Sequence, residues 1–213
     1  MYKNLMIALG SITTTVCIIT VVVIFVLQSD KIYLPSISEA GAFVNSYKIY
    51  ASGMVVGSMS MFFGLFGFIQ SQFHNASIIS RGNHAKKYFI IISTAVMCFS
   101  LGFQGVVPIQ LDKQMDSHRA AAGGFFCTAI FNSYLYCLLF NKTSKVSKMR
   151  TAIRRFCFLI LIANIGLTVH FFRKVTFNMS VTVDMMNLEP KFMTIFSILQ
   201  YSLVGVLEVV QLT

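Results

Sequence analysis

Residues 5–27 read LMIALGSITTTVCIITVVVIFVL, a stretch without a single charged side chain. An α-helix needs about 20 predominantly apolar residues to cross the hydrocarbon core of a bilayer, and this stretch is long enough to do so. It is also longer than the apolar region of a secretory signal peptide, which has about 7 to 15 residues, and no clear small-x-small cleavage site follows it. We therefore expect residues 5–27 to stay in the protein as a membrane-spanning helix.

The rest of the chain has the same character. Of its 213 residues, 56% are hydrophobic and 11% are charged, and the mean hydropathy is +0.74. The apolar share of a soluble domain is normally under about half. Five further apolar stretches follow, at about residues 51–70, 88–107, 120–140, 156–172 and 192–212. The sequence predicts an all-α, polytopic membrane protein, a single domain made of six transmembrane helices with short loops. The first, third and fifth loops are expected to form a small cap on the non-cytosolic side.

Charge predicts the orientation of this bundle. The net charge of +10 is carried by basic residues in short connectors between apolar stretches, and such connectors do not form the basic face that binds nucleic acid. We therefore expect no nucleic-acid partner. Cytoplasmic loops retain an excess of Lys and Arg, and the loops on the side of the N-terminus hold more of them than the opposite loops. Both termini are predicted to lie in the cytosol.

The second apolar stretch carries small residues on one helical face, at spacings of three and four residues. They are Gly53, Gly57, Ser60, Gly64 and Gly67. Small residues let helices approach closely in lipid, where no hydrophobic force drives them together. The pattern favours a packing seam inside the bundle. A homodimer face and a lipid groove stay open as alternatives.

A basic cluster lies in the connector at residues 141–155, which contains no acidic residue. Its members are Lys142, Lys145, Lys148, Arg150, Arg154 and Arg155. Such clusters fix membrane topology, and this is the favoured interpretation. They also attract anionic headgroups at about 1 kcal/mol per basic residue near the surface. Membrane lipids, including anionic phosphoinositides, are therefore the expected partners.

The third loop, QLDKQMDSHR, places Asp112, Asp116 and His118 near a membrane surface. A His beside a carboxylate can serve as a general base or a metal ligand. Nothing supplies the rest of a catalytic set, since there is no HExxH, no GxSxG and no buried acidic pair. A structural loop His is favoured, and neither a metal nor a cofactor is expected. Among the glycosylation triplets, only that at Asn178 would face the non-cytosolic side.

Ionisable residues are almost absent from the apolar stretches. Glu208 is the exception, and it lies near the end of the last one. Intramembrane charges usually mark ion or substrate pathways, so their scarcity argues against a proton-coupled pump or a carrier of charged substrates.

Residues 34–50 read LPSISEAGAFVNSYKIY, and this stretch resembles the signature of the DRAM (damage-regulated autophagy modulator) family of six-span membrane proteins. The matching residues are Pro35, Ile37, Ser38, Glu39 and Gly41. A second family feature falls on Gln110, His118, Ala122 and Phe126. The chain resembles a divergent member, because Glu39 replaces the usual Asp and Val44, Asn45 and Ser46 replace a Pro-Pro-Glu triplet. Ile109 replaces a Phe, and Gln200, before Tyr201, replaces an acidic residue of the last helix.

The resemblance implies a non-catalytic membrane modulator in the lysosome or another endomembrane, acting on autophagy, lysosomal function or membrane lipid organisation. Relatives in the wider group support phosphatidylinositol 4-kinase recruitment at the plasma membrane or take part in GPI-anchor lipid remodelling. The alternative is therefore a lipid-remodelling factor with a non-cytosolic site made of His118, Glu39, Asp112 and Asp116. A channel or carrier is a third alternative. A membrane-protein partner or a homodimer is compatible with each of them.

The first-loop motif also makes sense without the family. Pro35 biases the residue before it to an extended conformation, Ser38 can bond local backbone, and Gly41 permits a turn with positive φ. We expect this loop to fold back over the helix ends and to pack near His118.

Overall fold

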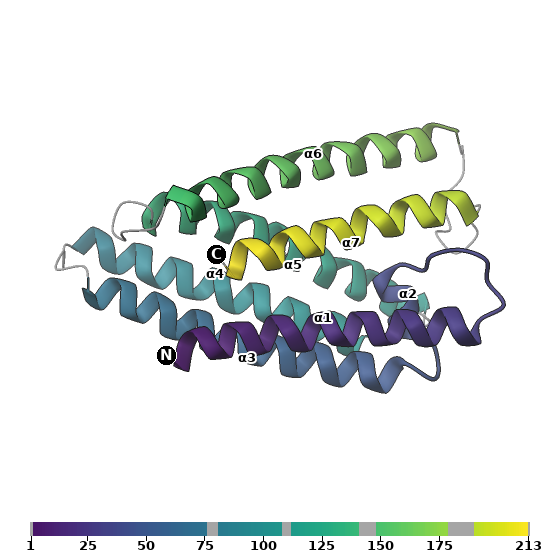
Figure 1. The fold of residues 1–213 in the computed structure, drawn as a ribbon, viewed down its shortest axis with the longest axis horizontal. Helices are drawn as coiled ribbons and strands as arrows, with labels where there is room; N and C mark the ends of the chain where they lie inside the picture. The colour runs from purple at the N-terminus through teal and green to yellow at the C-terminus, as the bar shows by residue number, and fades with distance from the viewer. Residues whose placement is uncertain (1, 76–80, 108–111, 141–147, 179–189, 213) are drawn as a thin grey trace.

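The computed structural model describes residues 2–75, 81–107, 112–140, 148–178 and 190–212. These described residues are helical with short connections and contain no β-strand (Figure 1). The helices are α1 (Tyr2–Gln28), α2 (Ile37–Ala42), α3 (Tyr47–Asn75), α4 (Arg81–Val106), α5 (Asp112–Phe140), α6 (Lys148–Asn178) and α7 (Pro190–Leu212). The predicted all-α class is thus what the structure has.

The long helices run side by side along one axis, and the short α2 lies at one end of the bundle (Figure 1). α1 packs along α3, α3 along α4, and α4 along α5. α6 packs along α7, and α7 also contacts α5, α1 and α2. α1 begins and α7 ends toward the end of the bundle that lies away from α2 (Figure 1). We call the two ends the α2 end and the terminal end.

Each predicted span matches one long helix to within one residue at its ends or lies inside it, but the helices extend further than hydropathy indicates. The stretch predicted at 156–172, for example, lies within α6, which has 31 residues. Hydropathy marks only the part of a helix that suits hydrocarbon, whereas a helix continues into polar flanks, because its backbone hydrogen bonds are internal at any depth. The largest correction concerns α5. It begins at Asp112, so His118 lies in a helix and not in a loop.

Three helical segments of the described chain are long and apolar enough to cross a membrane: Tyr2–Gln28, Tyr47–His74 and Ala85–Val106. Shorter apolar segments occupy Arg155–Leu167 and Met193–Leu207. The outward faces are apolar as well, since Ile12 and Ile19 of α1 are 60% and 58% exposed. Val21 and Phe25 on its inner face are buried. A helix that is apolar all round is typical of an integral membrane protein.

Candidate functional site

The first loop is fastened to the last helix. Ser36 caps α2, and its hydroxyl accepts a hydrogen bond from the Glu39 N–H at 3.2 Å. The Ile37 N–H, which has no partner within α2, donates to Oε1 of Gln200 on α7 at 3.0 Å. The Tyr201 hydroxyl donates to the Pro35 carbonyl at 2.8 Å. Two adjacent side chains of α7 therefore supply hydrogen-bond partners for backbone groups of the loop and of the first turn of α2 that have no partner within those segments.

Beneath α2 lies a polar cluster made of Ser38, Gln104 and His118, three buried side chains from α2, α4 and α5. Nε2 of His118 is 2.8 Å from the Ser38 Oγ, and Nδ1 is 2.8 Å from the carbonyl of Val107. Gln104 Nε2 donates to the same Ser38 Oγ at 3.3 Å. The first loop does pack on His118, as the sequence predicts, and Ser38 is the residue that makes the contact.

Hydrogen-bond logic assigns the tautomer of His118. The carbonyl of Val107 can only accept, so Nδ1 carries the proton, and Nε2 accepts from the Ser38 hydroxyl. Burial lowers the pKa of His118 below its usual value, and hydrogen bonds to the backbone of Val107 and Gln104 oppose this effect. Because the net shift is downward, the imidazole is neutral at neutral pH.

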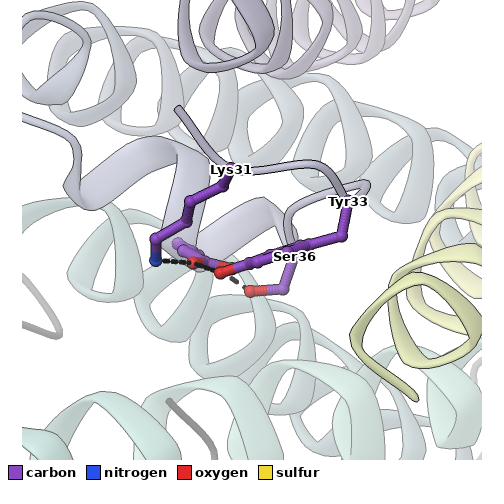
Figure 2. Close-up of polar contacts among 4 residues, drawn as sticks. Lys31, Tyr33 and Ser36 are labelled. Carbon is purple, nitrogen blue, oxygen red and sulfur yellow. Dashed lines mark hydrogen bonds and ion pairs between the residues drawn. The ribbon is translucent and has the colours of Figure 1, made fainter. Parts of the chain in front are cut away.

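Glu39 is directed away from His118 and bonds residues of its own loop. Its Oε1 accepts from Lys31 Nζ at 2.8 Å and from the Tyr33 hydroxyl at 2.5 Å, and Figure 2 shows Lys31 and Tyr33 beside the Ser36 cap. Partial burial acts to lower the pKa of Lys31, but its hydrogen bonds to Glu39 and Tyr33 raise it above the usual value. Burial, reinforced by Glu39, raises the pKa of Tyr33. Glu39 therefore partners Lys31 and Tyr33, and the cluster around His118 is built without it.

Gly41 has a different role from the one predicted. It lies within α2, and none of the described glycines has positive φ. A Cβ at this position would lie 2.5 Å from both Cγ and Cδ1 of Tyr50, whose side chain is buried. A glycine is required here because α2 rests directly on the Tyr50 ring.

The other residues predicted for the motif or the candidate site lie on α5 or outside the described part of the chain. Gln110 lies outside the described residues. Asp112 and Asp116 lie in the first two turns of α5, and their side chains are outside the described part. Ala122 and Phe126 follow on α5. Phe126 packs against the core and lines a cavity of about 20 Å³, which Gln104 and Gln200 also line. That volume holds about one water molecule.

No set of three or more His, Cys, Asp or Glu residues that could hold a metal ion occurs in the part of the chain that the structure describes.

The small residues of α3 line its contact with α1. A Cβ at Gly53 would lie 2.5 Å from Cys17 Sγ, and one at Gly64 would lie 2.6 Å from Ile7 Cγ1. Gly57 meets Thr14 in the same way, Gly67 faces Lys3, and Ser60 is buried. In this structure the glycine face is a seam between two helices of one chain.

The basic cluster falls partly on α6. Lys142 and Lys145 lie outside the described residues, while Lys148, Arg150, Arg154 and Arg155 belong to the first turns of α6. Of their side chains only that of Arg155 is described, and it is exposed.

Sequence reasoning missed Gln104. A lone amide in an otherwise apolar span was the available signal, because a buried amide in lipid needs a hydrogen-bond partner. Its partner, Ser38, is distant along the chain, so the pairing itself could not be predicted.

Comparison with known proteins identifies the family. No curated protein and no solved structure matches the chain. The family model described as Frag1/DRAM/Sfk1/Cwh43P N-terminal domain matches residues 2–210. That match includes the first loop, the polar cluster beneath it and the α7 residues that hold the loop in place. The chain therefore belongs to the Frag1/DRAM/Sfk1/Cwh43 family.

Proposed function

We propose that this protein is a non-catalytic, six-span membrane protein of the lysosome or another endomembrane, and that it acts on autophagy or membrane lipid organisation. In this proposal α1, α3, α4, α5, α6 and α7 each cross the bilayer, and both termini lie in the cytosol. The apolar outer faces of the helices and the excess of Lys and Arg in the terminal-end connectors support this arrangement.

One observation carries the proposal. Both ring nitrogens of His118 are engaged within the protein, and the residue is 4% exposed. A catalytic base must reach a proton of the substrate, whereas His118 and its partner Ser38 are both buried beneath α2, away from any substrate. His118 thus acts as a latch that holds the first loop on the bundle.

Replacing His118 by Ala tests this role, with His170→Ala on the exposed surface of α6 as the matched control. We expect His118→Ala to lower the yield of folded protein, because it leaves buried polar groups without partners. Any lipid or autophagy phenotype should follow protein abundance in both variants. Normal folding together with complete loss of a lipid-turnover activity would contradict the proposal.

The compartment can be tested separately. An epitope in the connector at residues 141–155 should be accessible from the cytosol and should coincide with lysosomal or other endomembrane markers. Plasma-membrane staining, or an epitope protected from cytosolic antibody, would refute this part.

The proposed lipid partners of the terminal-end connector are anionic headgroups, phosphoinositides among them. Six basic residues without an acidic neighbour support this contact, at about 1 kcal/mol each near the surface. Changing all six to Gln should weaken binding to vesicles that contain phosphoinositide. If vesicle binding is unchanged, the lipid contact is refuted and the basic cluster serves only to fix membrane topology. Any homodimer or membrane-protein partner would need a surface other than the glycine face, which α1 covers.

The second candidate is a lipid-remodelling enzyme, and one observation favours it. The Ser38 hydroxyl donates to a His118 imidazole whose tautomer is fixed from the other side. The same arrangement serves acyl transfer, in which a serine oxygen attacks an ester carbonyl and the imidazole takes the hydroxyl proton. Ser38→Ala separates the two candidates: an enzyme loses turnover with its fold intact, whereas a latch loses stability.

A further inference from the structure

An apolar groove runs between α3 and α4 on the outside of the bundle, with a volume of about 530 Å³. Small residues form its floor: Ser58 on α3, and Ala95 and Gly102 on α4. The two helices meet closely at this floor, since a Cβ at Gly102 would lie 2.8 Å from the Ser58 Oγ. The walls are made of large side chains, namely Met59, Phe62, Phe63, Phe99 and Phe103. The groove is therefore a depression between ridges and not a flat helix face.

The length of the groove along α4 matches the thickness of one leaflet. Its α4 side runs from Ala95 to Val106, about eleven residues at 1.5 Å each, or about 16 Å. Half of a hydrocarbon core of roughly 30 Å is about 15 Å. Val106 is the last residue of α4 and lies at the α2 end. The groove thus extends from the membrane surface at the α2 end to about the middle of the apolar segment Ala85–Val106.

Lys48 lies two helical turns before Val55, the first groove residue of α3. Lys48 and Ser52 precede the lining residues Val55, Met59 and Phe62 at spacings of three and four residues, so all five share one face of α3. Lys48 is exposed. The ion pair recorded among the described residues joins Lys31 to Glu39, which leaves the Lys48 ammonium without an acidic partner there.

We propose that this groove binds an acyl chain of an anionic phospholipid from the leaflet at the α2 end, with the net negative headgroup against Lys48. The inference deepens the proposed function and rests on it for the membrane placement of α3 and α4. The apolar lining and the aromatic walls suit a hydrocarbon chain, and the volume lies within the roughly 300–1,000 Å³ of known ligand sites. The exposed ammonium supplies the preference for a negative headgroup.

The test uses purified full-length protein in nanodiscs that contain a phosphatidylserine with a photoreactive acyl chain. We expect crosslinks to concentrate on the segments 55–63 and 95–106. Ala95→Phe fills the inner end of the groove and should remove most of these crosslinks. Ala163→Phe, on the exposed surface of α6, makes the same change outside the groove and should leave them unchanged.

A second pair of variants tests the headgroup contact. Lys48→Gln should lower the preference for phosphatidylserine over phosphatidylcholine probes by about five-fold, the effect of one basic residue near the surface. Lys86→Gln, exposed near the other end of α4, should not change it.

Crosslinks spread over α1, α4 and α6 in proportion to their exposure would overturn the proposal. So would equal effects of Ala95→Phe and Ala163→Phe. If Ala95→Phe does not fold, the crosslink positions in the unsubstituted protein decide alone. Lipid binding is measured here without cells, so an error in the proposed compartment or cellular role would not change the crosslinking result. Likewise, absence of crosslinks in the groove would not contradict the proposed compartment or cellular role.

Discussion

Gly41→Ala tests whether the first-loop motif contains glycine for close packing and not for a turn. The new Cβ would lie 2.5 Å from two atoms of the Tyr50 ring, whereas ordinary contacts begin at 3.4 Å. The ring is buried, so α2 must move outward by about 1 Å, in a core where overpacking costs about 1–3 kcal/mol. The matched control is Gly123→Ala on α5, where a Cβ meets nothing within 4 Å and helix propensity gains up to about 1 kcal/mol.

The assay is thermal unfolding of the purified variants in detergent. One kcal/mol shifts Tm by about 2–4 °C in a chain of this size. Gly41 also lies in a helix, so the gain in helix propensity is common to both variants. With overpacking of about 2 kcal/mol, Gly41→Ala should therefore melt about 4–8 °C below Gly123→Ala. In a Tyr50→Ala background the cost should largely disappear, because the atoms that clash are gone. If Gly41→Ala is as stable as Gly123→Ala, the packing explanation for this glycine is wrong.

Four changes test other contacts. Acidification should destabilise the protein, because the pKa of His118 is lower in the folded state than in the unfolded chain. The contribution of neutral His118 to stability is fully present above about pH 6.5. It is lost as the pH falls toward the lowered pKa of the folded state. Melting curves of His118→Gln should show a weaker dependence over that range. Gln200→Ala leaves the buried Ile37 N–H without its acceptor and should cost about 1–3 kcal/mol in unfolding free energy. Gly57→Leu should separate α1 from α3 and reduce the folded fraction in size-exclusion chromatography, whereas Gly166→Leu, at an open position, should not. Lys31→Met should change the unfolding free energy by less than about 1 kcal/mol, because the Lys31–Glu39 ion pair is half exposed at its lysine.

Hydropathy was enough to predict the helical class and the approximate place of each long helix. The contact between the first loop and His118 could also be predicted, because a Pro- and Gly-containing loop at the end of a bundle has few places to fold. The packing seam on α3 follows from residue size and spacing, but its partner α1 does not. Composition and the period of a single helix are recorded directly in one sequence.

What sequence reasoning got wrong depends on contacts between distant segments. Gly41 was expected to permit positive φ, but the reason for it is Tyr50, a residue on a neighbouring helix. Sequence reasoning groups Glu39 with His118 because both are ionisable, although α2 directs Ser38 toward His118 and Glu39 toward Lys31 and Tyr33. Gln200 stands where the family usually has an acidic residue, yet its amide oxygen still accepts the Ile37 N–H. None of these partners follows from spacing along the chain.

The bonds that join Pro35 and Ile37 to α7 have a consequence for biogenesis. Their partners lie 166 and 163 residues further along the chain. At a synthesis rate of about 5–20 residues per second, α7 follows the first loop by about 10–30 s. Throughout that interval the Pro35 carbonyl and the Ile37 N–H have no native partner, however well α1 and α3 have already inserted. The first loop can therefore complete its hydrogen bonds only after α7 has been synthesised and packed. A chain truncated before α7 would expose the unbonded first loop to the quality-control machinery of the membrane.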